Sequence, residues 1–150
     1  MTPAWDKAIE LLAIAEHSER DLTLKLKKRG YDEEEIRETV ARLFEVGYLD
    51  NDRYAKAYIR RSIKGKSSRR IRQELSQKGI RPEDPDRLLL EVYREEDCTE
   101  RETLERLVER KLRGNPHPDE KELRRLFAFL QRRGFSYHDI ASAIPVQDMA

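Results

Sequence analysis

The sequence predicts an all-α protein, an elongated tandem array of three helix-turn-helix-like repeats of three helices each, about nine helices in total. Apolar residues recur at helical spacing along the chain, no segment reads as a strand pair, and one glycine-centred pattern occurs three times. Charged residues make up 41% of the chain and hydrophobic residues only 37%. This composition favours several small cores in a row over one large core.

The repeated pattern is centred on Gly30, Gly79 and Gly134, which lie 49 and 55 residues apart. A glycine that ends an amphipathic helix is typical of a left-handed C-terminal stop. Each glycine has apolar residues at positions −8, −4, +1 and +10. They are Leu22, Leu26, Tyr31 and Val40 around Gly30; Ile71, Leu75, Ile80 and Leu89 around Gly79; and Leu126, Leu130, Phe135 and Ile144 around Gly134. The pattern predicts repeats at residues 1–48, 49–97 and 98–150.

Helix starts are marked by capping residues. Thr2 before Pro3 predicts a cap and first position for a helix over residues 3–15. A serine, threonine or aspartate with an acid three residues later is typical of a helix N-terminus, and this pattern occurs at Ser18, Asp32, Thr99, Asp119 and Ser136. These signals predict two further helices in the first repeat and three in the last.

The middle repeat departs from the others in two respects. Asp50 to Asp52 start a helix to about Ile63 whose apolar face contains Tyr54, Ala57 and Tyr58, with Ile59 as a further candidate. These tyrosines could stack on bases, although aromatic residues four apart on an apolar face are more typical of a core. A second helix, capped at Ser67 or Ser68, runs to Lys78, and Pro85 then starts a late and short third helix.

Positive charge is concentrated in the middle of the chain. Residues 52–81 hold eleven basic and two acidic residues, whereas residues 1–50 sum to −4, residues 82–122 to −6 and the whole chain to +1. The positive electrostatic potential of this region would attract a polyanion or an acidic protein groove, although the charges could also serve solubility alone. The candidate contact residues are Arg60, Arg61, Lys64, Lys66, Arg69, Arg70, Arg72 and Lys78.

Catalytic motifs do not emerge from the sequence. Gly65-Lys66-Ser67 resembles the end of a phosphate-binding loop, but Arg60 stands where that loop needs glycine, so Gly65 is interpreted as a hinge. The histidines, the acidic clusters and Cys98 lack metal-ligand spacing. We therefore expect no enzyme activity, no cofactor and no metal.

The expected cellular location is the cytoplasm. The single cysteine excludes an intramolecular disulfide and favours a reducing compartment. Acidic residues near the N-terminus are unlike the basic flank of a signal peptide, and no apolar run approaches the ~20 residues that span a bilayer.

Three stretches closely resemble the bacterial RecX regulatory proteins: GYLDNDRYAKAYI (residues 47–59), KSSRRIRQELSQKGI (66–80) and FLQRRGFSYHDI (129–140). The likeness extends from about Ile9 to Ile144. Two departures are Pro85, where the other repeats have an apolar residue, and Asn51, which interrupts a more usual pair of acids.

The resemblance implies a bacterial modulator of the recombinase RecA that is not an enzyme. RecX-like proteins are curved, tandem three-helix repeats that lie in the groove of the RecA–DNA filament and restrain filament growth, ATP hydrolysis and strand exchange. By this resemblance the eight basic residues face the filament and DNA. The implied partners are the RecA filament and, more weakly, single- and double-stranded DNA, with no membrane partner and a monomeric protein.

A second reading stays open at this point. Three short helices with a basic member are also typical of helix-turn-helix proteins that read DNA without RecA. A basic region that spans two helices and their connection fits a long groove better than a single half-site. Dependence on RecA separates the two readings.

Overall fold

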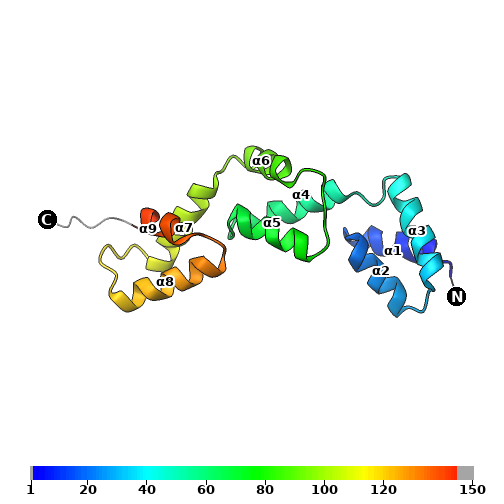
Figure 1. Ribbon diagram of the computed structural model, residues 1–150, viewed down its shortest axis with the longest axis horizontal. Helices are drawn as coiled ribbons and strands as arrows, with labels where there is room; N and C mark the ends of the chain where they lie inside the picture. Colours follow the sequence, from blue (N-terminus) through cyan, green and yellow to red (C-terminus); the bar gives the residue numbers. More distant parts are fainter. Residues whose placement is uncertain (1, 145–150) are drawn as a thin grey trace. The chain divides into compact units, whose positions relative to one another are not determined.

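A computed structural model describes residues 2–144, and every regular element in this range is an α-helix (Figure 1). The nine helices of the described range are α1 Ala4–Ile14, α2 Glu19–Lys28, α3 Glu33–Glu45, α4 Asn51–Ser62, α5 Ser68–Gln77, α6 Pro85–Glu95, α7 Glu100–Leu112, α8 Glu120–Arg132 and α9 Tyr137–Ala143. The predicted all-α class is confirmed.

Most predicted helix starts are confirmed by the cap hydrogen bonds. Side chains at five starts accept a backbone N–H from three residues further on, at 2.7–3.1 Å, and they are Ser18, Asp32, Thr99, Asp119 and Ser136. The prediction for Thr2 is wrong, because α1 begins at Ala4 and Pro3 holds the cap position. The Ala4 N–H donates instead to Glu35 Oε2 of α3, at 2.9 Å.

The threefold repeat is confirmed by identical hydrogen bonds at its glycines. Gly30, Gly79 and Gly134 have φ values of +91°, +73° and +96°. In each copy the N–H of the next residue donates to the carbonyl five residues back, at 3.3, 2.9 and 3.1 Å, which defines a Schellman helix end. That next residue is buried in every copy, as Tyr31, Ile80 and Phe135.

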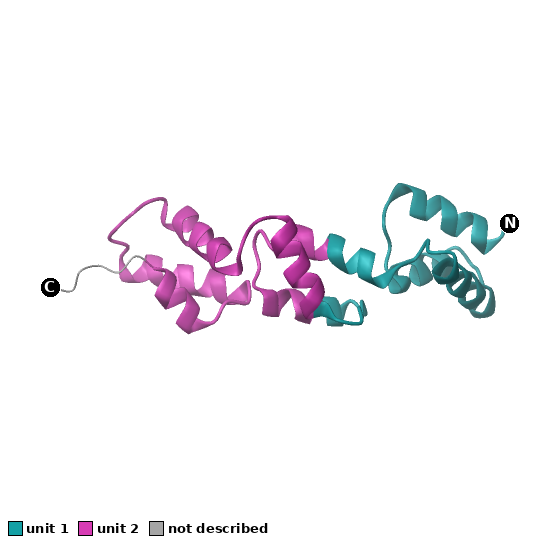
Figure 2. Ribbon diagram, turned by 90° about the horizontal axis from the view of Figure 1, so that it is seen from above, with its two compact units in different colours: residues 1–57, 75–85 teal, residues 58–74, 86–150 magenta. Residues whose placement is uncertain are grey.

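The chain packs as two compact units, residues 1–57 with 75–85 and residues 58–74 with 86–150 (Figure 2). We call them unit 1 and unit 2. The division cuts through α4 and α5, so residues of the middle repeat belong to both units. The repeat boundaries 1–48, 49–97 and 98–150 stay a prediction.

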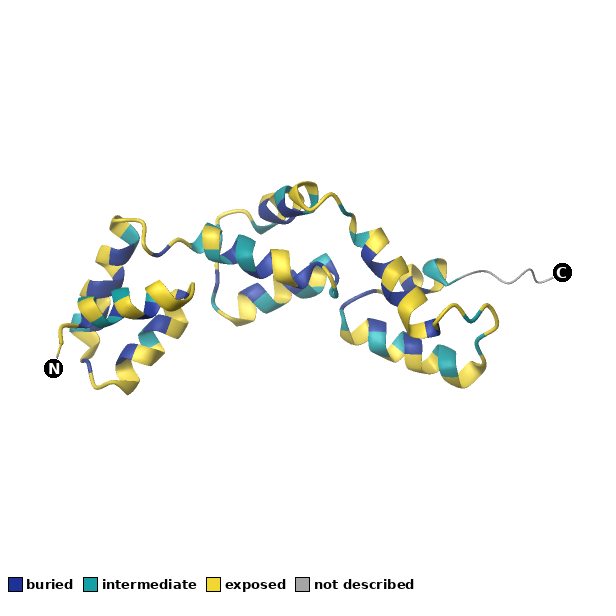
Figure 3. Ribbon diagram, turned by 180° about the vertical axis from the view of Figure 1, so that it is seen from behind, coloured by how far each residue is buried: buried dark blue, intermediate teal, exposed yellow. Residues whose placement is uncertain are grey.

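Each unit has its own core, built from the buried side of its helices (Figure 3). In unit 1, α1, α2 and α3 pack on one another around residues that include Leu22, Leu26 and Leu43. In unit 2, α7, α8 and α9 do the same around residues that include Leu104 and Leu130. The polar sides of the same helices remain exposed.

The middle repeat differs from its prediction in two details. The buried apolar residues of α4 are Ala55, Tyr58 and Ile59, whereas Tyr54 and Ala57 are only half-buried. The core positions predicted for Tyr58 and Ile59 are therefore confirmed, whereas the core role favoured for Tyr54 is not. Helix α6 does begin late, at Pro85, but with 11 residues it is not short.

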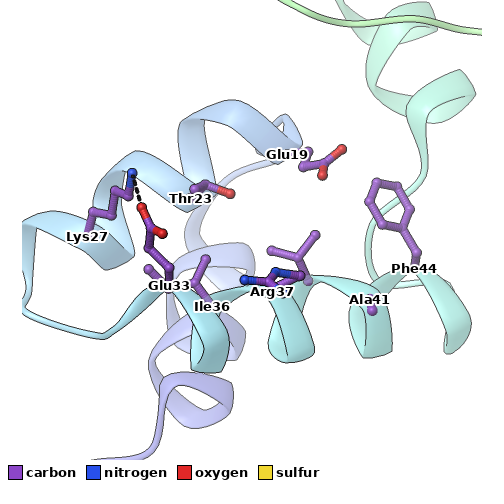
Figure 4. A pocket seen from close by; sticks show the side chains of 9 residues that line it. Glu19, Thr23, Lys27, Glu33, Ile36, Arg37, Ala41 and Phe44 are labelled. Atoms are coloured by element: carbon purple, nitrogen blue, oxygen red, sulfur yellow. Dashed lines mark ion pairs between the residues drawn. The ribbon is translucent and has the colours of Figure 1, made fainter.

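Unit 1 has an open hollow of about 400 Å³ between α2 and α3 (Figure 4). Its apolar lining includes Ile36 and Phe44, and Thr23 is a small residue on the α2 side. Lys27 and Glu33 form an ion pair at one end, at 3.3 Å.

The other repeats have larger interacting side chains in this region. In the third repeat Phe127, which corresponds to Thr23, stacks on Tyr137 with ring centroids 4.8 Å apart. In the second repeat the corresponding Arg72 pairs with Asp86 at 3.2 Å. The hollow of the first repeat is therefore explained by a short side chain at the position of Thr23.

Candidate functional site

The candidate basic residues lie around the connection between α4 and α5, and seven of the eight belong to unit 2. Arg60 and Arg61 occupy the last turn of α4, and Lys64 and Lys66 the connecting loop. Lys78 belongs to unit 1. The remaining three are on the first turns of α5, at Arg69, Arg70 and Arg72.

The connecting loop is held by the third repeat. Thr103 Oγ1 donates to the Ile63 carbonyl at 3.0 Å, and Arg106 donates to the Lys64 carbonyl at 2.8 Å. Arg133 donates to the Gly65 carbonyl at 3.3 Å. Carbonyls at the C-terminal end of a helix lack hydrogen-bond donors within that helix. Here three successive carbonyls accept hydrogen bonds from side chains of α7 and of Arg133, which follows α8.

Gly65 is therefore not a free hinge. A Cβ atom at this position would lie 3.0 Å from the Arg133 guanidinium, which is tighter than most Cβ contacts. The glycine allows Arg133 to approach the loop closely. The hinge interpretation of the Gly-Lys-Ser sequence is wrong, because the loop is bound on its carbonyl side.

The N-terminus of α5 is held in the same way. The Ser67 N–H donates to the Arg133 carbonyl at 2.9 Å, and Ser67 Oγ accepts the Arg70 N–H at 3.1 Å. The Ser68 N–H and hydroxyl both donate to the Glu100 carboxylate, at 3.0 and 2.9 Å. The direction of the basic helix is thus fixed by α7 and the end of α8.

Lys66 is directed inward, toward Glu74 of α5. Lys66 Nζ lies 2.7 Å from Glu74 Oε1 and donates to Oε2 at 2.9 Å, and Tyr58 donates a hydrogen bond to the same carboxylate. Burial alone would raise the pKa of Glu74, but Lys66, Tyr58 and the charge of Arg70 together more than offset it and lower that pKa. Burial, then the charge of Glu74, raises the pKa of Tyr58. Lys66 is therefore a structural residue within unit 2.

Two of the other basic residues are paired with acids of α6. Arg60 lies 3.2 Å from Glu95 and 3.4 Å from Glu96, and Arg72 lies 3.2 Å from Asp86. Their side chains are 46% and 42% exposed, so water screens these pairs and each contributes little to stability. A phosphate could replace either carboxylate at low cost.

Four basic residues form no ion pair with a carboxylate in the described chain, although the charge of Arg70 helps to lower the pKa of Glu74. The exposed side chains of Lys64 and Arg69 form no ion pair or hydrogen bond within the part of the chain that the structure describes. Arg61 lies over the Tyr58 ring at 5.9 Å, and Arg70 donates to Gln73 at 3.3 Å. These four are best placed to meet a polyanion.

Sequence reasoning missed the contribution of the third repeat. Arg133 binds the loop and also lies 4.9 Å from the ring centre of Phe129, whose ring has Lys111 4.1 Å from its centre. The only signal was that Arg132-Arg133 occupies the helix end that corresponds to basic residues in the other repeats. Nothing in the sequence showed that this end meets residues 65–67.

Within residues 2–144 no three His, Cys, Asp or Glu side chains gather as a metal site, and no helix is long and apolar enough to cross a membrane. Burial, together with Glu102 and Glu96, raises the pKa of the Cys98 thiol, which disfavours a reactive thiolate.

Comparison with known proteins matches three successive segments of the chain to one family. Residues 4–43 match the first three-helix domain of RecX, residues 50–88 the second and residues 99–144 the third. "Regulatory protein RecX" of Vibrio parahaemolyticus is 35% identical over 144 residues, covering 95% of this chain and 90% of that protein. The corresponding protein of Pseudomonas entomophila is 36% identical over 143 residues, with 95% and 90% covered.

Solved structures show the same fold. A crystal structure of RecX from Lactobacillus salivarius has a TM-score of 0.71 at 22% identity, with 94% of this chain and 92% of that chain covered. A second crystal structure of regulatory protein RecX has a TM-score of 0.74 at 23% identity, with 93% and 70% covered. Three family domains in order and relatives of similar length lead to one conclusion: this chain belongs to the RecX family of regulatory proteins.

Proposed function

We propose that this protein binds RecA–DNA filaments and inhibits filament growth, ATP hydrolysis and strand exchange. Family membership supports RecA as the partner, because RecX-like proteins are modulators of RecA. The observation that carries the proposal is the basic segment of unit 2, residues 60–72, which is held by residues of the third repeat through five hydrogen bonds to its backbone and one to the Ser68 hydroxyl. A fixed basic surface suits a regular polyanionic partner.

The charge arrangement supports contact with a phosphate backbone. Arg61, Lys64, Arg69 and Arg70 present charge that no carboxylate hydrogen-bonds in the described chain. When basic side chains neutralise phosphates, counterions leave the nucleic acid, so binding weakens as salt rises. We infer that these four residues meet DNA or an acidic filament surface, and that Arg60 and Arg72 join when their surface pairs open.

The same proposal treats the protein as a monomeric binding protein without catalytic activity. The relatives are named regulatory proteins. Sedimentation velocity at micromolar concentration is expected to give a single species of 17.8 kDa. A stable dimer would contradict the monomer.

The test is ATP hydrolysis by RecA on single-stranded DNA, titrated with this protein. We expect inhibition at well below one molecule per RecA, because a regulator that binds at filament ends or along the groove affects many subunits. The isolated protein, assayed without RecA, is expected to hydrolyse no ATP. Absence of inhibition at equimolar protein would contradict the proposal.

The alternative is a helix-turn-helix protein that reads DNA alone. Its prediction is tight binding to one duplex sequence without RecA, with affinity lost when base pairs of that sequence change. We expect instead weak binding to free DNA with no sequence preference. A strong preference for one duplex sequence would favour the alternative.

A further inference from the structure

Tyr48 belongs to the Gly-Tyr-Leu-Asp motif, yet its side chain has no role in the core. Gly47 ends α3 with a φ of +82°, Leu49 is 3% exposed, and Asp50 accepts the Arg53 N–H at 3.0 Å at the start of α4. Tyr48 is 52% exposed. Three of the four motif residues thus have a structural role, and the fourth presents an aromatic ring to solvent.

The backbone that carries Tyr48 is held by several hydrogen bonds. Arg53 donates to the Gly47 carbonyl at 3.2 Å and to the Tyr48 carbonyl at 2.9 Å. The same guanidinium donates to Glu16 beyond the end of α1 at 3.0 Å, and the Tyr48 N–H donates to the Leu43 carbonyl at 2.8 Å. A ring on a fixed backbone loses little conformational entropy when it is buried by a partner.

Trp5 and Tyr48 line an open groove of about 470 Å³ in unit 1, and we call it the Trp5–Tyr48 groove. The two ring centres are 6.2 Å apart. Ile9 and Leu12 of α1 contribute apolar lining, and Arg42 of α3 lies 4.4 Å from the centre of the Trp5 ring.

The groove has the composition of a protein-binding hot spot. Tryptophan, tyrosine and arginine are the residues most enriched where protein interfaces derive their affinity. Arg42 forms no ion pair with a carboxylate in the described part of the chain, so its charge is available to a partner. The charged residues that line the groove, Glu16 and Arg53, pair with each other at 3.0 Å, so the charge of Arg42 beside Trp5 is the one that favours a carboxylate of the partner.

We propose that the Trp5–Tyr48 groove binds a protein segment that inserts one large apolar side chain beside Tyr48 and places a carboxylate near Arg42. That the segment belongs to the RecA subunits of the filament rests on the proposed function. The chain would then hold its partner at two separate places, DNA or acidic protein at the basic segment and an apolar, acidic peptide at this groove.

The first arm of the test measures binding to RecA filaments on single-stranded DNA. Tyr48→Ser and Arg42→Glu are each expected to weaken binding about tenfold or more, with unchanged affinity for free DNA and an unchanged circular dichroism spectrum. The matched controls are Tyr137→Ser, at another exposed tyrosine, and Arg37→Glu, at another exposed arginine of α3, which are expected to bind like the wild type. Wild-type affinity in both groove variants would overturn the proposal while leaving the proposed function intact.

The second arm does not need RecA. Trp5 is the only tryptophan of the chain, so its fluorescence reports directly on the groove. The probe is a synthetic peptide with one phenylalanine between aspartates and glutamates, compared with the same peptide carrying lysines. We expect the acidic peptide alone to shift the Trp5 emission, and Arg42→Glu to abolish the shift.

The two arms separate the possible failures. If wild-type protein does not bind the filament, the proposed function fails, and the peptide result alone decides the groove. A shift caused by the lysine peptide or by an oligonucleotide, but not by the acidic peptide, would overturn the inference. A dimer that Tyr48→Ser dissociates would assign the groove to a second copy of the chain and also overturn it.

Discussion

Gly134→Ala tests the contact by which the third repeat fixes the basic helix. Gly134 follows α8 with a φ of +96°, and an added Cβ would overlap Ser67 Oγ and the Cβ of Arg70. Both partners belong to the start of α5. Gly30 is a matched control, because it has a φ of +91° at the corresponding position and nothing lies within 4 Å of an added Cβ.

Comparison of the two variants separates the backbone contribution from the packing contribution to the loss of stability. A left-handed alanine costs about 1–2 kcal/mol, so Gly30→Ala should lower the free energy of unfolding by that amount. Gly134→Ala has the same backbone cost and must also displace a packed neighbour, which adds about 1–3 kcal/mol. The second contribution includes any weakening of the Ser67 N–H bond to the Arg133 carbonyl.

Urea denaturation followed by circular dichroism gives both free energies, and amide hydrogen exchange gives the local effect. We expect Gly134→Ala to speed exchange of the Ser67 amide and to weaken inhibition of RecA, whereas Gly30→Ala should do neither. Equal destabilisation by the two variants, with Ser67 still protected, would refute the claim that Gly134 provides a contact needed by α5.

Three other predictions concern stability. Folding lowers the pKa of Glu74 below its usual 4.5, so the ionised carboxylate stabilises the protein above pH 4.5. This stabilisation is lost as the pH falls through the pKa that Glu74 has in the folded protein. Lys66→Met should therefore reduce the pH dependence of the unfolding free energy measured in urea. Thr23→Phe with Glu33→Tyr should fill the hollow between α2 and α3 and raise stability by about 1 kcal/mol, read as a higher Tm. Leu75→Ala should cost about 2–5 kcal/mol in urea denaturation, since Leu75 is 2% exposed.

Each of these three predictions has a result that would contradict it. An unchanged acid transition in Lys66→Met would mean that Lys66 does not hold Glu74 ionised. A lower Tm in the double aromatic variant would mean that the first repeat cannot accept the packing of the third. Wild-type stability in Leu75→Ala would contradict the burial of the repeated −4 position.

Local sequence signals predicted the fold well because they act over a few residues. A capping serine or aspartate accepts a hydrogen bond from the N–H three residues further on. At each repeated glycine, the helix ends with a hydrogen bond between backbone groups five residues apart. Thr2 failed as a cap because Glu35, 31 residues from Ala4, satisfies the same donor. The length of α6 was misjudged because Pro85 determines where that helix starts and not where it ends.

The candidate site was predictable only as a region. The concentration of charge identified its eight residues, but not which of them are paired or how their backbone is held. Those properties depend on residues far away in the sequence: Glu95 is 35 residues from Arg60, and Arg133 is 68 residues from Gly65. Sequence could not show that Lys66 is bound inside unit 2 or that Lys64 and Arg69 remain available. The pairing of Lys66 arises when α4 and α5 pack together, and the pairs of Arg60 and Arg72 arise when α6 is in place.

The most direct test compares two triple variants in the RecA ATPase assay. Arg61→Ala with Lys64→Ala and Arg69→Ala removes three positive charges from the basic segment, and the control removes three from exposed sites elsewhere in unit 2, at Arg110, Lys121 and Arg125. We expect the first variant to lose most inhibition and the control to inhibit like the wild type. Equal inhibition by both variants would contradict the claim that this basic surface contacts the filament.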